Sequence, residues 1–242
     1  MNTNKVFKFN NKTTISKILL NFLGNVFFVY ALVVAFALIL FSCVTIDCIV
    51  EGESMRPTLN NYISDKKKDE VFVNIYDKKI AYQDIVVVKT DKDVKADKCD
   101  IIKRVVGMPG DLIDIVLVNN EYKLERNGQV VEEKYINYDY SPDVAALYKN
   151  GMKKTNDQLR EYKLKNPEKF NSEGKLIVDN DSIFVLGDNR GNSQDSSVYG
   201  CFSYEKLVGK VEFIKYSDSS DFAFYYDYIV EGKFINTFLN LF

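Results

Sequence analysis

Ser54 is the residue of this 242-residue sequence best placed for covalent chemistry. It lies in Gly-Glu-Ser-Met-Arg-Pro-Thr-Leu at residues 52–59, where Pro57 fixes the backbone and favours a rigid, exposed loop. A serine hydroxyl is a weak nucleophile until a neighbouring base takes its proton. The sequence contains no histidine, so that base must be a lysine, a carboxylate or an N-terminal amine. The alternative is a turn serine whose hydroxyl bonds only to the local backbone.

Lys103 is the candidate base. It lies in Ile-Ile-Lys-Arg-Val-Val at residues 101–106, so on a strand its side chain has apolar neighbours on its own face. Apolar surroundings disfavour an ammonium ion and lower the pKa of a lysine toward the range in which the neutral amine accepts a proton. The alternative is an edge-strand lysine whose ammonium reaches water past its aliphatic stem.

A third stretch, Gly-Asp-Asn-Arg-Gly-Asn-Ser-Gln-Asp-Ser at residues 187–196, has the composition of a polar turn. In their order and spacing, the three stretches resemble the type I signal peptidases, membrane-anchored serine proteases with a Ser-Lys dyad. Residues 83–88 resemble the family's G-D-I-V-V strand with its glycine replaced, and residues 200 and 208–210 resemble its closing segment. The resemblance covers most of the chain and thins out at residues 141–170 and in the C-terminal tail.

The resemblance implies a role for each matching residue. Ser54 would attack the scissile carbonyl, Lys103 would be its general base, and the backbone N–H of Ser54 would help form the oxyanion hole. Some relatives add a hydroxyl where this sequence has Gly52, so here the backbone or another group must stabilise the oxyanion. Ser193 would orient the lysine amine. Asp188 would pair with Arg104.

The sequence departs from the family at Ser197, where relatives commonly have an arginine that pairs with the residue at position 195. Asp195 therefore lacks its usual cationic partner. We expect either that Arg190 takes this role or that the loop carrying Ser193 is looser here, because an unpaired buried carboxylate is unfavourable.

The N-terminal part predicts a membrane anchor. No charged residue occurs between Ile18 and Ile46, and the most apolar part of this segment would span the hydrocarbon core of a bilayer as a helix. Four lysines precede the segment, and the first acidic residue, Asp47, follows it. This asymmetry predicts a cytoplasmic N-terminus at residues 1–17, a transmembrane helix at 18–46 and an extracytoplasmic domain beyond, hence a single-pass protein of the cell membrane.

Residues 47–221 are predicted to form a mainly β, antiparallel catalytic domain of the signal-peptidase type. An Asn127-Gly128 dipeptide predicts a two-residue hairpin. Residues 141–170 read as a partly helical insertion whose charges face solvent, and residues 222–242 as an aromatic tail that packs on the domain or rests at the membrane interface. The strands are predicted, from their Val, Ile, Phe and Tyr content, at 70–76, 85–89, 100–106, 112–118, 122–126, 129–133, 175–178, 181–186 and 208–216.

Composition excludes several classes of protein. Of 32 Lys and Arg, four precede the anchor, leaving 28 against 34 Asp and Glu beyond it, an acidic balance that argues against a nucleic-acid partner. Without histidine or a C-x-x-C spacing we expect no metal and no cofactor, and a Cys99–Cys201 disulfide stays open.

The function expected from these observations is cleavage of signal peptides from exported preproteins after an Ala-x-Ala-like site, with signal peptides and the lipid bilayer as partners. One rival is a self-cleaving Ser-Lys repressor, against which the membrane helix and the acidic outer domain argue. The other is an inactive membrane-tethered β module that binds exported proteins.

Overall fold

The computed structural model describes residues 11–60, 68–90, 100–133, 135–136, 142–216 and 222–224. The chain divides into two compact units, Met1–Val44 and Thr45–Phe242. The first contains helix α1, Asn11–Val44, in which Lys17–Ile39 is long and apolar enough to cross a membrane. Most of its described side chains are exposed.

Helix α1 ends at Val44, two residues before the predicted end of the transmembrane segment at Ile46. The chain continues as strand β1, Thr45–Ile49, which pairs antiparallel with β2, Glu70–Asn74. Two β-branched residues, Thr45 and Ile46, favour the extended backbone, and pairing with β2 fixes it. The residues that close the apolar run therefore belong to the second unit rather than to the anchor.

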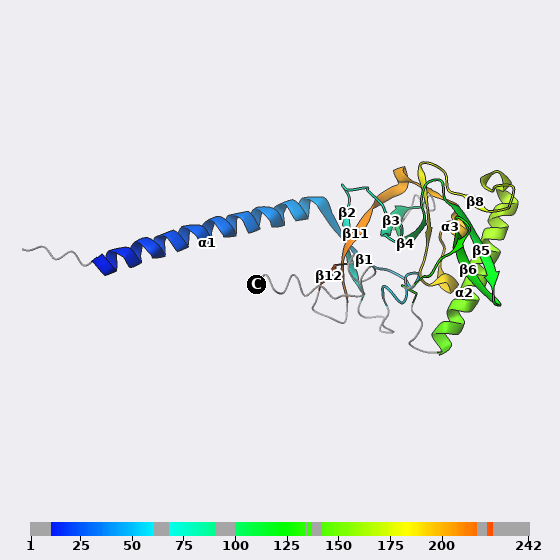
Figure 1. The fold of residues 1–242 in the computed structure, drawn as a ribbon, viewed down its shortest axis with the longest axis horizontal. Coiled ribbons are helices and arrows are strands. Elements are labelled where there is room, and N and C mark those ends of the chain that lie inside the picture. Colours follow the sequence, from blue (N-terminus) through cyan, green and yellow to red (C-terminus); the bar gives the residue numbers. More distant parts are fainter. Residues whose placement is uncertain are drawn as a thin grey trace, which may run out of the picture. The chain divides into compact units, whose positions relative to one another are not determined.

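The second unit contains two antiparallel sheets (Figure 1). The larger has the order β1-β2-β11-β3-β4-β9-β10, with β12 also on β11. Its further strands are β3 Ile85–Lys89, β4 Asp100–Gly107, β9 Ser182–Leu186, β10 Phe202–Ser203, β11 Leu207–Lys215 and β12 Phe222–Phe224. The smaller has the order β7-β6-β5-β8, with β5 Leu112–Val118, β6 Glu121–Arg126, β7 Gln129–Val130 and β8 Leu176–Ile177.

The predicted antiparallel β fold is confirmed, because each predicted strand corresponds to an observed one. The hairpin at Asn127-Gly128 joins β6 to β7, and both residues have positive φ, 54° and 79°. These angles fit a type I′ turn, whose twist matches that of the flanking strands. The last predicted boundary, after residue 221, falls inside the sheet because β12 pairs with β11. The rest of the predicted tail, 225–242, lies outside the described residues.

Strand β4 runs through the middle of the larger sheet, between β3 and β9. Apolar side chains pack on both faces around it. One group includes Val86, Val105 and Val185, and a second includes Val106, Phe184 and Leu186. A strand buried on both faces is held in a fixed register, since a slip by one residue would exchange its two faces.

Helix α2, Pro142–Lys165, forms most of the predicted insertion and is followed by a short 3₁₀ turn, Pro167–Lys169. Its charged residues 153, 154, 157, 160 and 161 are exposed, as predicted. The helix is nevertheless more than a solvated surface element. Met152, Thr155 and Leu159 are buried, with the spacing of one helical face. This face packs on β6, on the short helix α3, Ser196–Tyr199, and on the 3₁₀ turn η2, Arg190–Asn192 (Figure 1).

Cys201 is a free thiol whose pKa is raised by burial to about 12. Cys99 lies outside the described residues.

Candidate active site

Ser54 and Lys103 lie side by side in the second unit. Lys103 Nζ donates a hydrogen bond to Ser54 Oγ at 2.7 Å. It donates another to the backbone carbonyl oxygen of Ile102 at 2.8 Å. The same contact would let a neutral lysine accept the proton of the serine hydroxyl. The two residues come from a loop and from a central strand that are far apart in the sequence.

Lys103 is buried, with an exposed fraction of 3%. Strand β4 is not an edge strand, so the interpretation of Lys103 as an edge-strand residue reaching water is wrong. Burial lowers the pKa of Lys103 to about 8 from 10.5, and the negative charges of Asp195 and Asp188 oppose this effect. A substantial fraction of the amine is therefore neutral slightly above neutral pH.

The loop that carries Ser54 is tied to the domain on both sides of the serine. Met55 and Leu59 are buried in the core, and Leu59 N donates to Met55 O at 2.9 Å. The carbonyl of Ser54 accepts from Asn189 N at 2.9 Å. Glu53 O accepts from the side-chain amide of Asn189 at 3.1 Å. The serine loop is therefore held in two ways. Apolar packing holds it through Met55 and Leu59, and hydrogen bonds from Asn189 tie it to residues 187 to 195, which we call the 187–195 loop.

Arg104 and Asp188 form a fully buried, bidentate ion pair beside Lys103. Arg104 Nε donates to Asp188 Oδ1 at 2.8 Å and Nη2 to Oδ2 at 2.5 Å. Thr58 Oγ1 also donates to Asp188 Oδ2, at 2.6 Å. Because Thr58 lies just beyond Ser54, this carboxylate joins the serine loop, strand β4 and the 187–195 loop. A paired arrangement of this kind fixes geometry as well as charge.

Among the described residues Asp195 has no arginine partner, so the first of the two expected alternatives, in which Arg190 takes that role, is wrong. Asp195 is the N-cap of α3 and accepts three hydrogen bonds, from Ser197 N at 3.1 Å, Ser197 Oγ at 2.8 Å and Gly187 N at 2.9 Å. A buried carboxylate that accepts several donors needs no cation. The serine at position 197 thus solvates Asp195 itself.

Arg190 instead pairs with Glu133. Its guanidinium donates to both carboxylate oxygens of Glu133, Nη1 to Oε2 at 2.9 Å and Nη2 to Oε1. Its Nε donates to Gly187 O at 3.0 Å. The side chain of Arg190 is fully buried and that of Glu133 is 4% exposed.

Ser193 is buried beside the dyad, but its expected hydrogen bond to the lysine amine is absent. Ser193 Oγ has no hydrogen-bond partner among the described residues, while Lys103 Nζ bonds to Ser54 Oγ and Ile102 O. Close packing places the hydroxyl against Gly187, where an added Cβ would lie 2.3 Å from Ser193 Oγ and 2.5 Å from Ser54 O. Only glycine fits at position 187. The role of Ser193 stays a prediction.

Gly52 is exposed and has a φ of +82°, in the left-handed region that favours glycine. A Cβ built at this position would meet no atom within 4 Å, so a larger side chain would have room. The positive φ, not a lack of space, is therefore what favours glycine here. Position 52 contributes no side-chain donor to the site.

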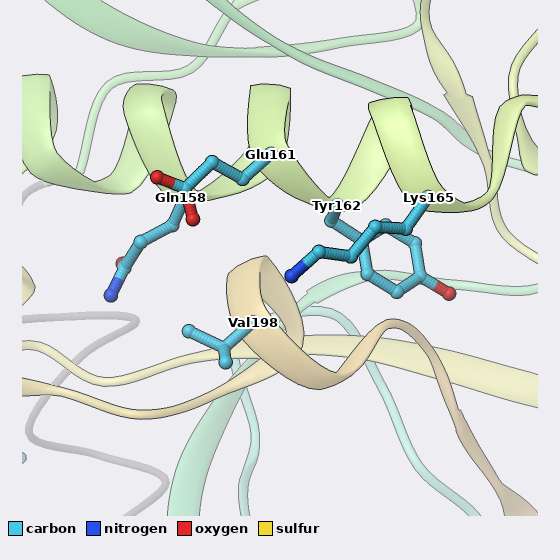
Figure 2. Close-up of a pocket in the computed structure, with 5 residues that line it drawn as sticks. All are labelled: Gln158, Glu161, Tyr162, Lys165 and Val198. Atoms are coloured by element: carbon cyan, nitrogen blue, oxygen red, sulfur yellow. The ribbon is translucent and has the colours of Figure 1, made fainter.

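A small hollow of about 60 Å³ lies between α2 and α3, lined by Gln158, Glu161, Tyr162, Lys165 and Val198 (Figure 2). Gln158 Oε1 lies 3.1 Å from Ser197 Oγ, so the hollow adjoins the residue that solvates Asp195. It contains none of the residues of the dyad. Within the part of the chain that the structure describes, no three Cys, Asp or Glu side chains gather as metal ligands.

Sequence reasoning missed three residues around the site: Thr58, Glu133, and Tyr135, whose hydroxyl donates to Glu133 Oε1 at 2.5 Å. Thr58 lay within the serine motif and next to a proline, which signalled a turn rather than a partner for Asp188. Glu133 and Tyr135 follow a short strand and belong to none of the three motifs, so no spacing pointed to them.

Comparisons with known proteins identify the family of the chain. The family described as signal peptidase, peptidase S26, matches residues 23–216. Signal peptidase I S of Bacillus subtilis is 30% identical over 187 residues, 76% of this chain and 83% of that one. Signal peptidase IB of Staphylococcus aureus is 32% identical over 171 residues, 68% of this chain and 74% of that one. A crystal structure of a signal peptidase I from Enterococcus faecalis aligns at 23% identity with a TM-score of 0.36, over 55% of this chain and 97% of that one, a likeness too low to bear on function. With its match over most of the sequence, the chain belongs to the S26 family of signal peptidases.

Proposed function

We propose that Ser54 and Lys103 are the catalytic dyad with which this signal peptidase cleaves signal peptides from exported preproteins after an Ala-x-Ala-like site. The observation that carries the proposal is the 2.7 Å contact between Ser54 Oγ and the amine of a buried lysine whose pKa is lowered to about 8. Such an amine is neutral often enough to act as a base, and it touches the hydroxyl that it must deprotonate.

Acylation proceeds in one proton cycle. Lys103 takes the proton of Ser54 as Oγ attacks the scissile carbonyl carbon, and the resulting ammonium gives that proton to the departing amine of the mature protein. The signal peptide remains as an ester on Ser54. Lys103, neutral again, takes a proton from a water molecule that attacks the ester, and returns it to Oγ as the acid leaves.

The backbone N–H of Ser54 would donate to the oxyanion that forms in both steps. Because Gly52 supplies no hydroxyl, any side-chain donor that stabilises the oxyanion must come from another residue; otherwise the backbone alone stabilises it. The Asn189–Ser54 and Arg104–Asp188 contacts hold the serine loop in place, so that the donor is oriented before the substrate arrives.

A binding-only module is the less economical interpretation. Burial of a lysine amine among apolar side chains is unfavourable, as the lowered pKa of Lys103 reflects. A protein that merely bound exported chains would gain nothing from this arrangement. A self-cleaving repressor is also disfavoured, since an apolar helix of membrane-spanning length precedes the domain.

The test is cleavage of a purified preprotein by the detergent-solubilised full-length protein, with mass spectrometry of the released mature N-terminus. Wild-type protein should release one product cut after the Ala-x-Ala-like site, and Ser54→Ala and Lys103→Ala should each lose nearly all turnover. The double variant should be hardly slower than either single one, because residues that act as one unit give non-additive losses. Equal cleavage by Ser54→Ala and the wild type would refute the assignment.

A further inference from the structure

Glu133 occupies a buried position that the proposed chemistry does not use. It follows β7 in the smaller sheet, and its carboxylate reaches Arg190 at the start of η2. Both oxygens of the carboxylate accept from the guanidinium, and both side chains are at least 96% buried. Removing one partner of such a pair leaves the other charge buried and unpaired. The 133–190 pair is therefore a fixed connection between the smaller sheet and the 187–195 loop.

Arg190 carries this connection into the loop. Besides Glu133, it donates to Gly187 O at 3.0 Å, and its Nη1 lies 3.0 Å from Met152 Sδ of α2. Gly187 N in turn donates to Asp195. The guanidinium thus bridges the start of the loop to Glu133, while Asp195 ties the end of the loop back to the same glycine.

The 187–195 loop packs tightly against the serine loop. Gly187 lies so close to Ser193 Oγ and Ser54 O that a single added carbon would overlap both. Asn189 N holds the carbonyl of the nucleophile, Ser54 O, at 2.9 Å. A displacement of the loop would therefore move Ser54 relative to Lys103, and misplacement of reacting groups by about 1 Å can slow catalysis about 100-fold.

Tyr135 provides a second route from Glu133 toward the dyad. Its hydroxyl donates to Glu133 Oε1 at 2.5 Å, and its ring lies 3.9 Å from the Arg104 guanidinium carbon. Burial and the charge of Glu133 raise the pKa of Tyr135 well above its usual range, so the hydroxyl keeps its proton. Arg104 is the residue that pairs with Asp188, next to Lys103 on β4.

We infer that Glu133 is a positioning residue of the dyad, which sets the place of the 187–195 loop through Arg190 and that of Arg104 through Tyr135. This inference rests on the proposed function, because it concerns the rate of the same reaction. It goes beyond the three sequence motifs, none of which includes Glu133 or Tyr135.

Two variants distinguish an effect of Glu133 on the position of the dyad from an effect on the stability of the protein. Glu133→Gln removes the negative charge that accepts two hydrogen bonds from the Arg190 guanidinium, so it should lower both the melting temperature and kcat. Glu133→Gln with Arg190→Met removes the buried charges together, which should restore most of the melting temperature. Since it does not restore the bridge to Gly187, kcat should stay down by about 10- to 100-fold while KM changes by less than about threefold. The control is Glu168→Gln, at an exposed glutamate of the 3₁₀ turn after α2, which should match the wild type.

The pH dependence supplies a readout that a purely structural role would not move. Lys103 faces Ser54 and the carboxylates of Asp188 and Asp195, with Arg104 next to it on β4; Glu133 and Arg190 face Tyr82 and Tyr135. If the loop withdraws, Asp188 and Asp195 support the ammonium form less. The acid limb of kcat/KM in the double variant should therefore move to lower pH than in the wild type, and NMR titration of Lys103 in a Ser54→Ala background should show the same shift without turnover.

The outcomes are distinct. A wild-type protein that does not cleave preproteins refutes the proposed function, and the NMR titration then still decides whether Glu133 positions Lys103. A wild type that cleaves, with a double variant that recovers both melting temperature and kcat, overturns only the positioning role. Glu133→Asp guards against a misfolded variant, since it keeps the charge on a shorter side chain. It should fold and cleave about 10-fold more slowly, and wild-type kcat in this variant would count against the inference.

Discussion

At the scale of single residues, Lys103 meets two opposing demands. Its amine must lie among apolar side chains to lose its proton, yet the carboxylates of Asp188 and Asp195 lie near enough to stabilise the ammonium form. Burial is the larger effect, and the pKa falls to about 8. Because both carboxylates are already occupied, Asp188 by Arg104 and Asp195 by three hydrogen-bond donors, neither is available as a direct ion-pair partner for the lysine. Because the two carboxylates bind other groups, the amine of Lys103 can lose its proton and act as a base.

The first prediction concerns pH. Because only the neutral amine of Lys103 is a base, kcat/KM should rise with pH along a limb near pH 8 and level off above it. Initial rates of preprotein cleavage from pH 5 to 10 would give this profile. A rate that is already constant from pH 5 upward would mean that another group activates Ser54.

The second prediction concerns protein stability, which burial of the charged Lys103 amine lowers. The pKa of its amine is lower in the folded protein, about 8, than the unperturbed 10.5, so between these values the unfolded chain binds more protons and stability rises with pH. Lys103→Met removes this penalty. It should be inactive and more stable than the wild type by about 3 kcal/mol below pH 8, with the difference shrinking toward pH 10.5.

Thermal unfolding of both proteins at several pH values measures this difference. Lys103→Arg is the control that keeps the charge, and it should be inactive without the gain in stability, because a guanidinium stays protonated. A Lys103→Met variant no more stable than the wild type at pH 6 would show that the lysine is not strained by burial.

The third prediction concerns Ser197. Its hydroxyl is one of three donors to the Asp195 carboxylate, and both residues are buried. Ser197→Ala should therefore destabilise the protein by about 1–3 kcal/mol. The matched control is Ser203→Ala, since the Ser203 side chain makes no capping hydrogen bond. Equal melting temperatures for Ser197→Ala and the control would show that Asp195 is solvated by other means.

At the scale of elements, helix α2 packs against the 187–195 loop and supports it. Gly151 of this helix lies so close to η2 that an added Cβ would lie 2.5 Å from Gly191 N and 2.9 Å from the carbonyl carbon of Arg190. Lys154 donates to Gly191 O at 3.0 Å, and Met152 meets Arg190. The segment that the sequence marked as a surface insertion thus determines where the 187–195 loop begins to turn. Its outer face is charged because it faces water, whereas its inner face is part of the core.

The fourth prediction follows from this contact. A glycine within a helix normally gains about 1 kcal/mol of stability when it becomes alanine. Gly151→Ala should do the opposite, because the new methyl group meets backbone atoms that cannot rotate away. We expect a lower melting temperature and a lower kcat, with Lys153→Ala on the exposed face as control. A stabilised, fully active Gly151→Ala protein would show that the helix and the loop are not in tight contact.

At the scale of the whole molecule, an apolar helix precedes a β domain that contains the proposed dyad. The helix has the length and composition of a membrane span, and the members of this family are membrane-bound signal peptidases. Signal peptides present their cleavage sites near the outer face of the membrane, so a tethered serine close to that face would meet its substrate without diffusing. That arrangement requires the β domain to lie outside the cytoplasm, which we propose from the four lysines that precede the helix.

The fifth prediction tests this topology. Protease added outside spheroplasts should degrade the β domain and leave the lysine-rich N-terminus protected, because positively charged flanks remain in the cytoplasm. Epitope tags at the N-terminus and in the 127–128 turn would report the two sides by immunoblotting. A protected β domain would overturn the orientation and, with it, the access to exported preproteins.

The sequence by itself determined the apolar helix and the antiparallel strands, and it pointed to Ser54 and Lys103, the two residues that we propose as the dyad. These features follow from local information: a long uncharged run, β-branched and aromatic residues between turns, and motifs whose residue types carry chemistry. Resemblance to a known family added the pairing of Asp188 with Arg104, which the structure contains.

Only the tertiary structure decided the partners of Asp195 and Arg190, the inner face of α2 and the place of Glu133. Each of these depends on contacts between segments distant in the sequence, and a charge in a sequence does not say which opposite charge it will meet. Arg190 is near Asp195 along the chain, yet it binds Glu133, which follows β7 of the smaller sheet, because Ser197 and Gly187 already satisfy Asp195. The energy of burying a charge is settled by everything that packs around it, and that packing exists only once the chain has folded.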